Sequence, residues 1–190
     1  EVLHNLGKDI GDSVNISSSI VDADMLTIFE NEPSCFLLGK GVGEGAAREG
    51  ALKLKEITYI HTEGYSSSAL KHGPFALLHP GFPVILFAPD DAHFAKNQNA
   101  FQEMVSRGAE VIVIRNVNAD MVSESGEEGE EGDTLSVFSE SVREIIVPRN
   151  PTFQAIINII PVQIMAYRLS VHRGINPDTP KNLAKVVTVE

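Results

Sequence analysis

Residues 34–45 read Ser-Cys-Phe-Leu-Leu-Gly-Lys-Gly-Val-Gly-Glu-Gly. The short apolar run is typical of a buried strand, and the glycines after it allow a tight turn before the helical spacing of residues 46–56. A strand, a tight turn and a helix in this order begin a parallel βαβ unit. This stretch therefore predicts an α/β domain whose parallel sheet is covered by helices on both faces.

The rest of the chain repeats this alternation of apolar runs and helical stretches. Further strands are predicted at 57–61, 84–88, 111–114 and 144–147. Helices are predicted near 20–31, 66–71, 92–107 and 152–173. We therefore expect a doubly wound parallel sheet flanked by helices, and ligands bind such sheets beyond the carboxyl ends of the strands. This rule directs attention to the loops after Leu38, His61 and Ala88.

The last predicted helix carries boundary signals at both ends. Asn150 is a cap candidate, Pro151 fits the first helical position, and Gly174 follows the final turn. Apolar residues occupy nearly every face between residues 153 and 171, so we expect burial on more than one side. Pro161 removes a backbone hydrogen bond and should kink the helix locally.

Charge and composition narrow the classes of function. The 190 residues include 15 Lys and Arg against 26 Asp and Glu, and residues 120–133 hold seven acids without a base. Such a tract predicts a solvated, disordered loop. The absence of a basic stripe disfavours nucleic acid, and the short, proline-broken apolar runs disfavour a membrane span. The single cysteine, Cys35, lies in an apolar run, which suits a buried thiol in the reducing cytoplasm.

The glycine-rich turn leaves two interpretations open. Gly41-x-Gly43-x-x-Ala46 fits a dinucleotide fingerprint, and Glu63 lies where a ribose-binding acid would be expected. This interpretation predicts a nucleotide-binding oxidoreductase domain. A loop that contacts an anion or a sugar through backbone N–H groups at a helix N-terminus fits the turn equally well.

A polar stripe on helix 46–56 is a second candidate site. Glu49, Lys53 and Glu56 are spaced by four and three residues, so they share one helical face. The face is either a solvated salt-bridge stripe or a pocket wall where a carboxylate moves a proton between sugar carbons. His72 stands before Gly73 and Pro74, which predict a turn that exposes its ring. The histidines and the cysteine show no metal-ligand spacing, so no metal is expected.

Three segments then carry a resemblance to a known family. Residues 49–65 read Glu-Gly-Ala-Leu-Lys-Leu-Lys-Glu-Ile-Thr-Tyr-Ile-His-Thr-Glu-Gly-Tyr, residues 70–74 read Leu-Lys-His-Gly-Pro, and residues 180–190 read Pro-Lys-Asn-Leu-Ala-Lys-Val-Val-Thr-Val-Glu. Together they resemble the second sugar isomerase (SIS) domain of the glutamine–fructose-6-phosphate amidotransferase family. The resemblance runs from about Cys35 to the last residue.

The resemblance implies a flavodoxin-like SIS fold and a part in making glucosamine 6-phosphate from fructose 6-phosphate and ammonia, without a cofactor. By motif position, Glu56 matches the base that moves a proton from C1 to C2, and His72 matches a ring-opening histidine given to the neighbouring subunit of a homodimer or larger oligomer. Lys185 matches a lysine that forms an imine at C2. Lys53, Glu49 and Ala184 match substrate-binding groups, and Ala184 and Val187 also match the wall of an ammonia path.

The same resemblance implies a division of the chain. We expect a linker helix region from a truncated upstream domain in residues 1–32, a SIS domain in 33–175, and an ordered catalytic tail in 176–190. The family's phosphate-binding loop and its cysteine nucleophile belong to other domains, so this chain alone should be inactive. Lys181 and Val186 depart from the family's usual arginine and serine, which bears on how the tail is anchored. A non-catalytic SIS module that binds sugar phosphates is the alternative.

Overall fold

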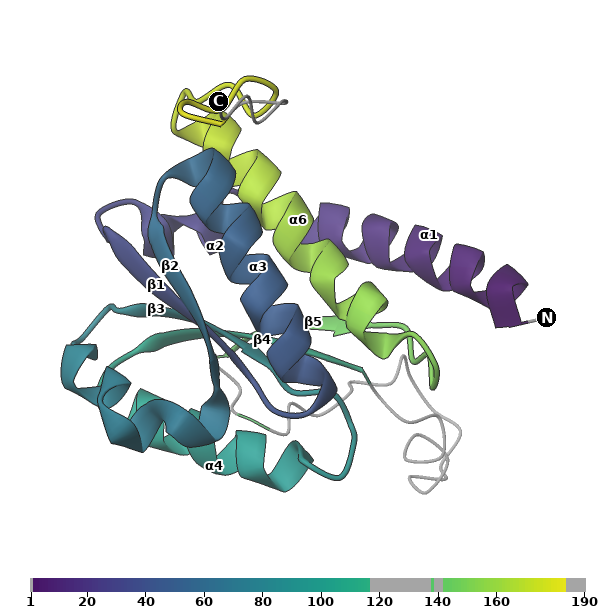
Figure 1. Cartoon of the computed structure of the whole chain (residues 1–190), viewed down its shortest axis with the longest axis horizontal. Coiled ribbons are helices and arrows are strands. Elements are labelled where there is room, and N and C mark those ends of the chain that lie inside the picture. The colour runs from purple at the N-terminus through teal and green to yellow at the C-terminus, as the bar shows by residue number, and fades with distance from the viewer. Residues whose placement is uncertain (1, 117–137, 139–141, 184–190) are drawn as a thin grey trace, which may run out of the picture.

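A five-stranded parallel sheet forms the centre of the molecule (Figure 1). The computed structural model describes residues 2–116, 138 and 142–183. The strands are β1 (Ser34–Gly39), β2 (His61–Ser66), β3 (Pro83–Phe87), β4 (Glu110–Asn116) and β5 (Arg143–Val147). Their spatial order, β2-β1-β3-β4-β5, is that of flavodoxin-like sheets. The predicted doubly wound parallel fold is therefore confirmed.

Helices cover both faces of the sheet (Figure 1). They are α1 (Val2–Ile20), α2 (Ala23–Leu26), α3 (Val42–Thr58), α4 (Phe94–Val105) and α6 (Gln154–His172), with short 3₁₀ segments η1 (Thr27–Phe29), η2 (Ser67–His72) and η3 (Pro74–Leu77). On β1, Leu37 packs into the core shared with α1, α3 and α6, whereas Phe36 and Leu38 pack into the core shared with α4. This alternation buries both faces of the central strands, as expected for a parallel sheet.

The second strand lies further along the chain than its predicted range of 57–61. Helix α3 continues to Thr58, and Tyr59 ends it in the left-handed conformation, with φ of 60°. Ala47, Ala51 and Leu54 are buried at helical spacing, and this pattern favours a helix that continues towards Thr58. Strand β2 is an edge strand of mostly polar residues, so it lacks the apolar run that marks a buried strand. The expected loop after His61 accordingly follows Ser66.

The N-terminal helix also differs from the prediction of 20–31. The long helix is α1, and residues 23–29 form only the short α2 and η1. Leu6 and Ile10 of α1 pack against the core, while the next inward positions, Ser13 and Ser17, are fully buried serines. Small polar residues at buried positions weaken the apolar periodicity by which such a helix is found.

Helix α6 packs against α1 and α3, and it is buried on more than one side, as predicted. Asn150 accepts hydrogen bonds from the backbone N–H groups of Thr152 and Phe153, but Phe153 is the N-cap. The prediction of Pro151 as first helical residue is therefore wrong, because residues 151–153 form a turn. The helix runs on through Pro161 and ends before Gly174, whose φ is 69°.

The apolar composition of α6 follows from this packing. By length and composition alone the helix could cross a membrane, but half of its most apolar stretch is buried inside the domain. Its approach to α3 is close: a Cβ atom on Gly50 would lie 2.7 Å from a Leu37 methyl carbon and 3.2 Å from one of Val162. Glycine at this position lets the two helices pack together over the sheet.

Candidate active site

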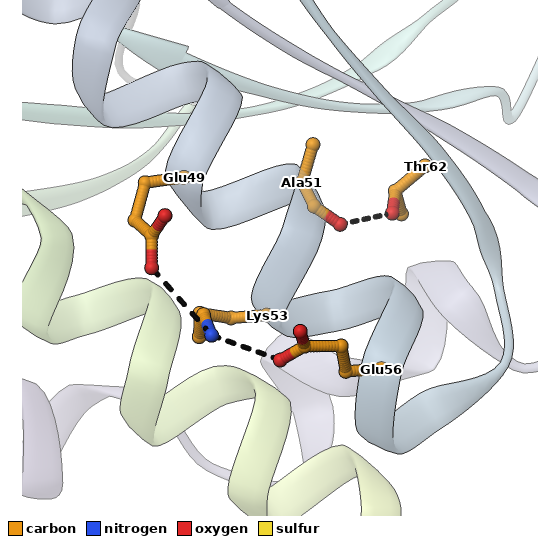
Figure 2. A network of polar contacts seen from close by, with 5 residues as sticks. All are labelled: Glu49, Ala51, Lys53, Glu56 and Thr62. Carbon is orange, nitrogen blue, oxygen red and sulfur yellow. Dashed lines mark hydrogen bonds and ion pairs between the residues drawn. The ribbon is translucent and has the colours of Figure 1, made fainter. Parts of the chain in front are cut away.

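Glu49, Lys53 and Glu56 form one ionic cluster on α3, as their spacing predicts (Figure 2). Lys53 Nζ donates to Glu56 Oε2 at 2.8 Å and lies 3.6 Å from Glu49 Oε1. The side chains of Lys53 and Glu56 are 32% and 30% exposed, so both are partly withdrawn from water. The hydrogen bond from Lys53 to Glu56 raises the pKa of the lysine, although burial acts in the opposite direction. The cluster thus holds a carboxylate beside a stable cation.

The opposite side of α3 is fixed to the sheet. Thr62 Oγ1 of β2 donates to the carbonyl oxygen of Ala51 at 2.5 Å, on the side of the helix away from the cluster (Figure 2). A Cβ atom on Gly64 would lie only 2.6 Å from the Cα atom of Arg48, so glycine allows helix and strand to approach this closely. These contacts set the position of the backbone that carries the ionic cluster.

The end of α3 also receives the chain that follows α6. Arg173 Nη1 donates to the Thr58 carbonyl oxygen at 3.0 Å. The Lys181 backbone N–H donates to Tyr59 Oη at 2.8 Å, and the Lys181 ammonium lies 4.3 Å from the centre of the Tyr59 ring. Arg173 and Lys181 therefore both contact the C-terminal end of the helix that carries Glu56. No sequence pattern singled out Tyr59 or Arg173, because these contacts join residues more than 100 positions apart.

His72 is exposed at the end of η2, in the turn that Gly73 and Pro74 predict. Gly73 has φ of 144°, a value that favours glycine. Glu56 precedes the start of β2 and His72 follows its end, and a strand of six residues spans roughly 17 Å. The two therefore lie beyond opposite ends of β2, and the structure does not bring them together within one chain.

Several predicted features lie outside the described residues. These are Ala184, Lys185, Val187 and the acidic tract 120–133. Their predicted roles therefore stay predictions. Among residues 2–116, 138 and 142–183, no three His, Cys, Asp or Glu side chains gather into a group that could hold a metal ion.

The glycine-rich turn lies at the carboxyl edge of the sheet, away from the ionic cluster. Gly41 has φ of 58°, and a Cβ atom there would lie 2.6 Å from the His93 ring. Strand β2 reaches this edge at Ser66, which pairs with Gly39. Glu63 pairs with Phe36, three residues earlier on the strand, so it lies roughly 10 Å short of the edge. This position disfavours the dinucleotide interpretation, which needs an acid beside the turn.

The Glu63 carboxylate also accepts a hydrogen bond from a neighbouring side chain. Tyr65 donates a hydrogen bond to Glu63, and this bond raises the pKa of Tyr65 to about 12. The carboxylate that a ribose would need is thus already bonded to the phenol.

Comparison with known proteins defines the class. The SIS domain family model matches residues 28–173, and the chain belongs to this family. Among its relatives, a probable glutamine–fructose-6-phosphate aminotransferase [isomerizing] of Acanthamoeba polyphaga mimivirus is 48% identical over 169 residues, covering 87% of this chain and 25% of that protein. The corresponding Schizosaccharomyces pombe protein, also named as probable, is 35% identical over 189 residues, 99% of this chain and 25% of its own length.

A solved structure agrees with these relatives. The C-terminal domain of glucosamine-fructose-6-phosphate aminotransferase from Francisella tularensis superposes with a TM-score of 0.76 at 28% identity, covering 93% of this chain and 45% of that one. The chain spans about a quarter of the length of the curated relatives it matches.

Proposed function

We propose that this chain is the sugar-isomerising C-terminal part of a glutamine-dependent enzyme that makes glucosamine 6-phosphate from fructose 6-phosphate. The observation that carries this proposal is the Glu56 carboxylate, which Lys53 holds on the side of α3 away from its contact with β2 (Figure 2). The names of the relatives, of which this chain spans about a quarter, supply the substrate and the reaction class, and the similar C-terminal domain supports the position.

Glu56 has the chemistry that an aldose–ketose conversion needs. Once C2 of fructose 6-phosphate carries nitrogen, the product forms when a proton leaves C1 and a proton arrives at C2. A carboxylate can take the first proton and return it, so that its own charge is unchanged at the end. Lys53 stays protonated because its pKa is raised, and it therefore orients Glu56 without competing for the proton.

His72 would act in the site of another subunit. Its separation from Glu56 by the length of β2 supports this assignment, because a ring on one chain cannot serve the Glu56 of the same chain across that span. We therefore propose that the working protein is a homodimer or a larger homo-oligomer, in which the exposed turn around His72 enters the neighbouring site to open the sugar ring.

The remaining roles fall on the C-terminal tail and on other domains. Lys185 is proposed to form the imine at C2, and Ala184 and Val187 to line the path of ammonia released from glutamine by a separate glutaminase domain. Without that domain and the phosphate-binding loop of a first SIS domain, the 190-residue chain should make no product.

The full burial of its single cysteine, Cys35, supports a reducing, cytoplasmic location.

The test is an assay of the complete polypeptide that contains this chain. Glucosamine 6-phosphate should form from fructose 6-phosphate with either glutamine or ammonium ion as nitrogen source. Borohydride reduction in the presence of fructose 6-phosphate, followed by peptide mass spectrometry, should place the sugar adduct on Lys185. Binding of the sugar phosphate without turnover or adduct would instead identify a non-catalytic SIS module, and an adduct on another lysine would refute the assignment of Lys185.

A further inference from the structure

Glu56 lies in the last turn of α3, the part of a helix whose backbone is held least firmly. The helix ends at Thr58, two residues later, and the final carbonyl groups of a helix have no partner within it. Helix ends fray unless other groups bond to them. The backbone under Glu56 therefore needs support from outside the helix if the carboxylate is to keep one position.

Thr58 provides part of this support through its side chain. The residue is fully buried, and its hydroxyl group donates to the Leu54 carbonyl oxygen at 2.7 Å and accepts the backbone N–H of Ile60 at 3.3 Å. These two bonds join the last turn of α3 to the residue that precedes β2. They fix the path by which the chain leaves the helix.

Arg173 provides the other part from a distant segment. It is the C-cap residue of α6, and its Nη1 donates to the Thr58 carbonyl oxygen at 3.0 Å across 115 positions of sequence. A cation is favoured at this end of a helix, where the peptide dipoles place partial negative charge. Since α6 packs beside α3 (Figure 1), the arginine links the last turn of one helix to the end of the other.

We propose that Arg173 is a positioning residue, which caps the C-terminal turn of α3 and thereby holds Glu56 in place for proton transfer. The catalytic part of this inference rests on the function proposed above. Lys53 orients the carboxylate itself, whereas Arg173 bonds to Thr58 and acts only through the backbone of the turn. Loss of Arg173 should misplace the base rather than weaken sugar binding, and a displacement of about 1 Å can lower a rate roughly 10²-fold.

Hydrogen–deuterium exchange of the complete protein tests the cap without reference to catalysis. R173M removes the hydrogen-bond donor and the charge, so it should speed exchange of the amides of residues 55–58 about three- to tenfold. R173K keeps a cation that can donate to one carbonyl oxygen, and it should stay within about twofold of the wild-type rate. The matched control is R48M in the first half of α3, which breaks an exposed pair with Glu44 and should leave these amides unchanged.

Steady-state kinetics then tests the positioning role. R173M should lower kcat for glucosamine 6-phosphate formation by roughly three- to 30-fold while the KM for fructose 6-phosphate stays within about twofold, and R173K should stay close to the wild type. Deuterium at C1 of the sugar should slow R173M more than the wild type, because proton removal by Glu56 becomes the slower step. Partial loss of folded protein would lower the rate without raising this isotope effect.

Each of the other results would count against a specific part of the proposal. Wild-type exchange of residues 55–58 in R173M overturns the cap, and R173K that exchanges as fast as R173M overturns the role of the charge. Equal acceleration in the buried strand β3 overturns a local effect on α3. Faster exchange of the last turn with unchanged kcat and isotope effect overturns the positioning role. A wild-type protein without sugar turnover refutes the proposed function, while the exchange rates still decide the cap.

Discussion

The ammonium group of Lys53 lies 2.8 Å from a carboxylate oxygen of Glu56, one turn further along α3. Neither group is exposed by more than about a third, so the pair is partly shielded from the water that would otherwise screen it. The hydrogen bond fixes the orientation of the carboxylate and raises the pKa of the lysine. Both consequences can be measured separately, the first through catalysis and the second through stability.

The substitution E56Q should stop sugar isomerisation in the complete enzyme. The amide keeps the shape of the carboxylate but cannot accept a proton, and loss of a positioned general base lowers the rate by roughly 10²- to 10⁴-fold. Release of glutamate from glutamine should continue, since it depends on a different domain in our proposal. The measurement is parallel assay of glucosamine 6-phosphate and glutamate.

The matched control is E44Q on the same helix. Glu44 pairs with Arg48 at 2.8 Å in an exposed i,i+4 contact, so its loss should change synthesis little. Synthesis by E56Q within a few-fold of the wild-type rate would mean that Glu56 only forms a salt bridge and is not the catalytic base.

Removal of Lys53 should change stability in a way that depends on pH. The pKa of Lys53 is raised in the folded state, so the pair stabilises the fold below the unfolded lysine pKa, near 10.5, and this contribution is lost as pH rises through the folded pKa. K53M should therefore lower the free energy of unfolding by about 0.2–1 kcal/mol at pH 8. Urea unfolding at pH 8 and above pH 11 should show the difference shrinking at the higher pH.

The exposed lysine of the same helix provides the comparison: K55M should show no such pH-dependent difference. A K53M deficit that stays the same size above pH 11 would mean that lost packing rather than charge explains it.

Mixed oligomers should reveal whether His72 serves a neighbouring subunit. H72A and E56Q should each be inactive, but a heterodimer of the two has one site with both an intact Glu56 and an intact His72. Co-expression with two affinity tags, followed by tandem purification, isolates this species, and it should recover up to about half of wild-type activity. Inactive heterodimers of proven composition would contradict a shared site.

Two glycines should respond to alanine in opposite directions. A Cβ atom on Gly64 meets the backbone of α3, so G64A should push helix and strand apart and cost about 1–3 kcal/mol of stability. A Cβ atom on Gly45, inside α3, would meet no described atom within 4 Å, so G45A should stabilise the helix by about 0.5–1 kcal/mol. Thermal unfolding of the two variants checks both signs, and a stabilised G64A would contradict the close approach.

The sequence predicted the buried centre of the fold better than its edges. Strands β1, β3 and β4 are covered on both faces, so their apolar runs were found close to their observed positions. Strand β2 is an edge strand of mostly polar residues, so no apolar run marks it. The prediction therefore ended helix α3 too early and began the strand at residue 57. Helix α1 packs partly through the buried serines 13 and 17, which do not produce an apolar stripe.

The ionic cluster was predictable for a different reason. Residues three and four apart on a helix are neighbours whatever the rest of the chain does, so Glu49, Lys53 and Glu56 had to meet if residues 46–56 were helical. The contact of Tyr59 with Lys181 depends on the path of all the residues between them, and no local pattern encodes that path. The separation of Glu56 from His72 likewise required the observed start and end of β2.

At Tyr59, the residue that best fits the left-handed backbone differs from the residue that can contact Lys181. Helices commonly end with glycine in this conformation, because a side chain there is strained by about 1–2 kcal/mol. Glycine at position 59 would relax the backbone but would remove at once the hydroxyl and the ring that Lys181 contacts. Selection for a relaxed backbone and selection for the contact with Lys181 would therefore favour different residues at position 59, and tyrosine keeps the contact while the backbone stays strained.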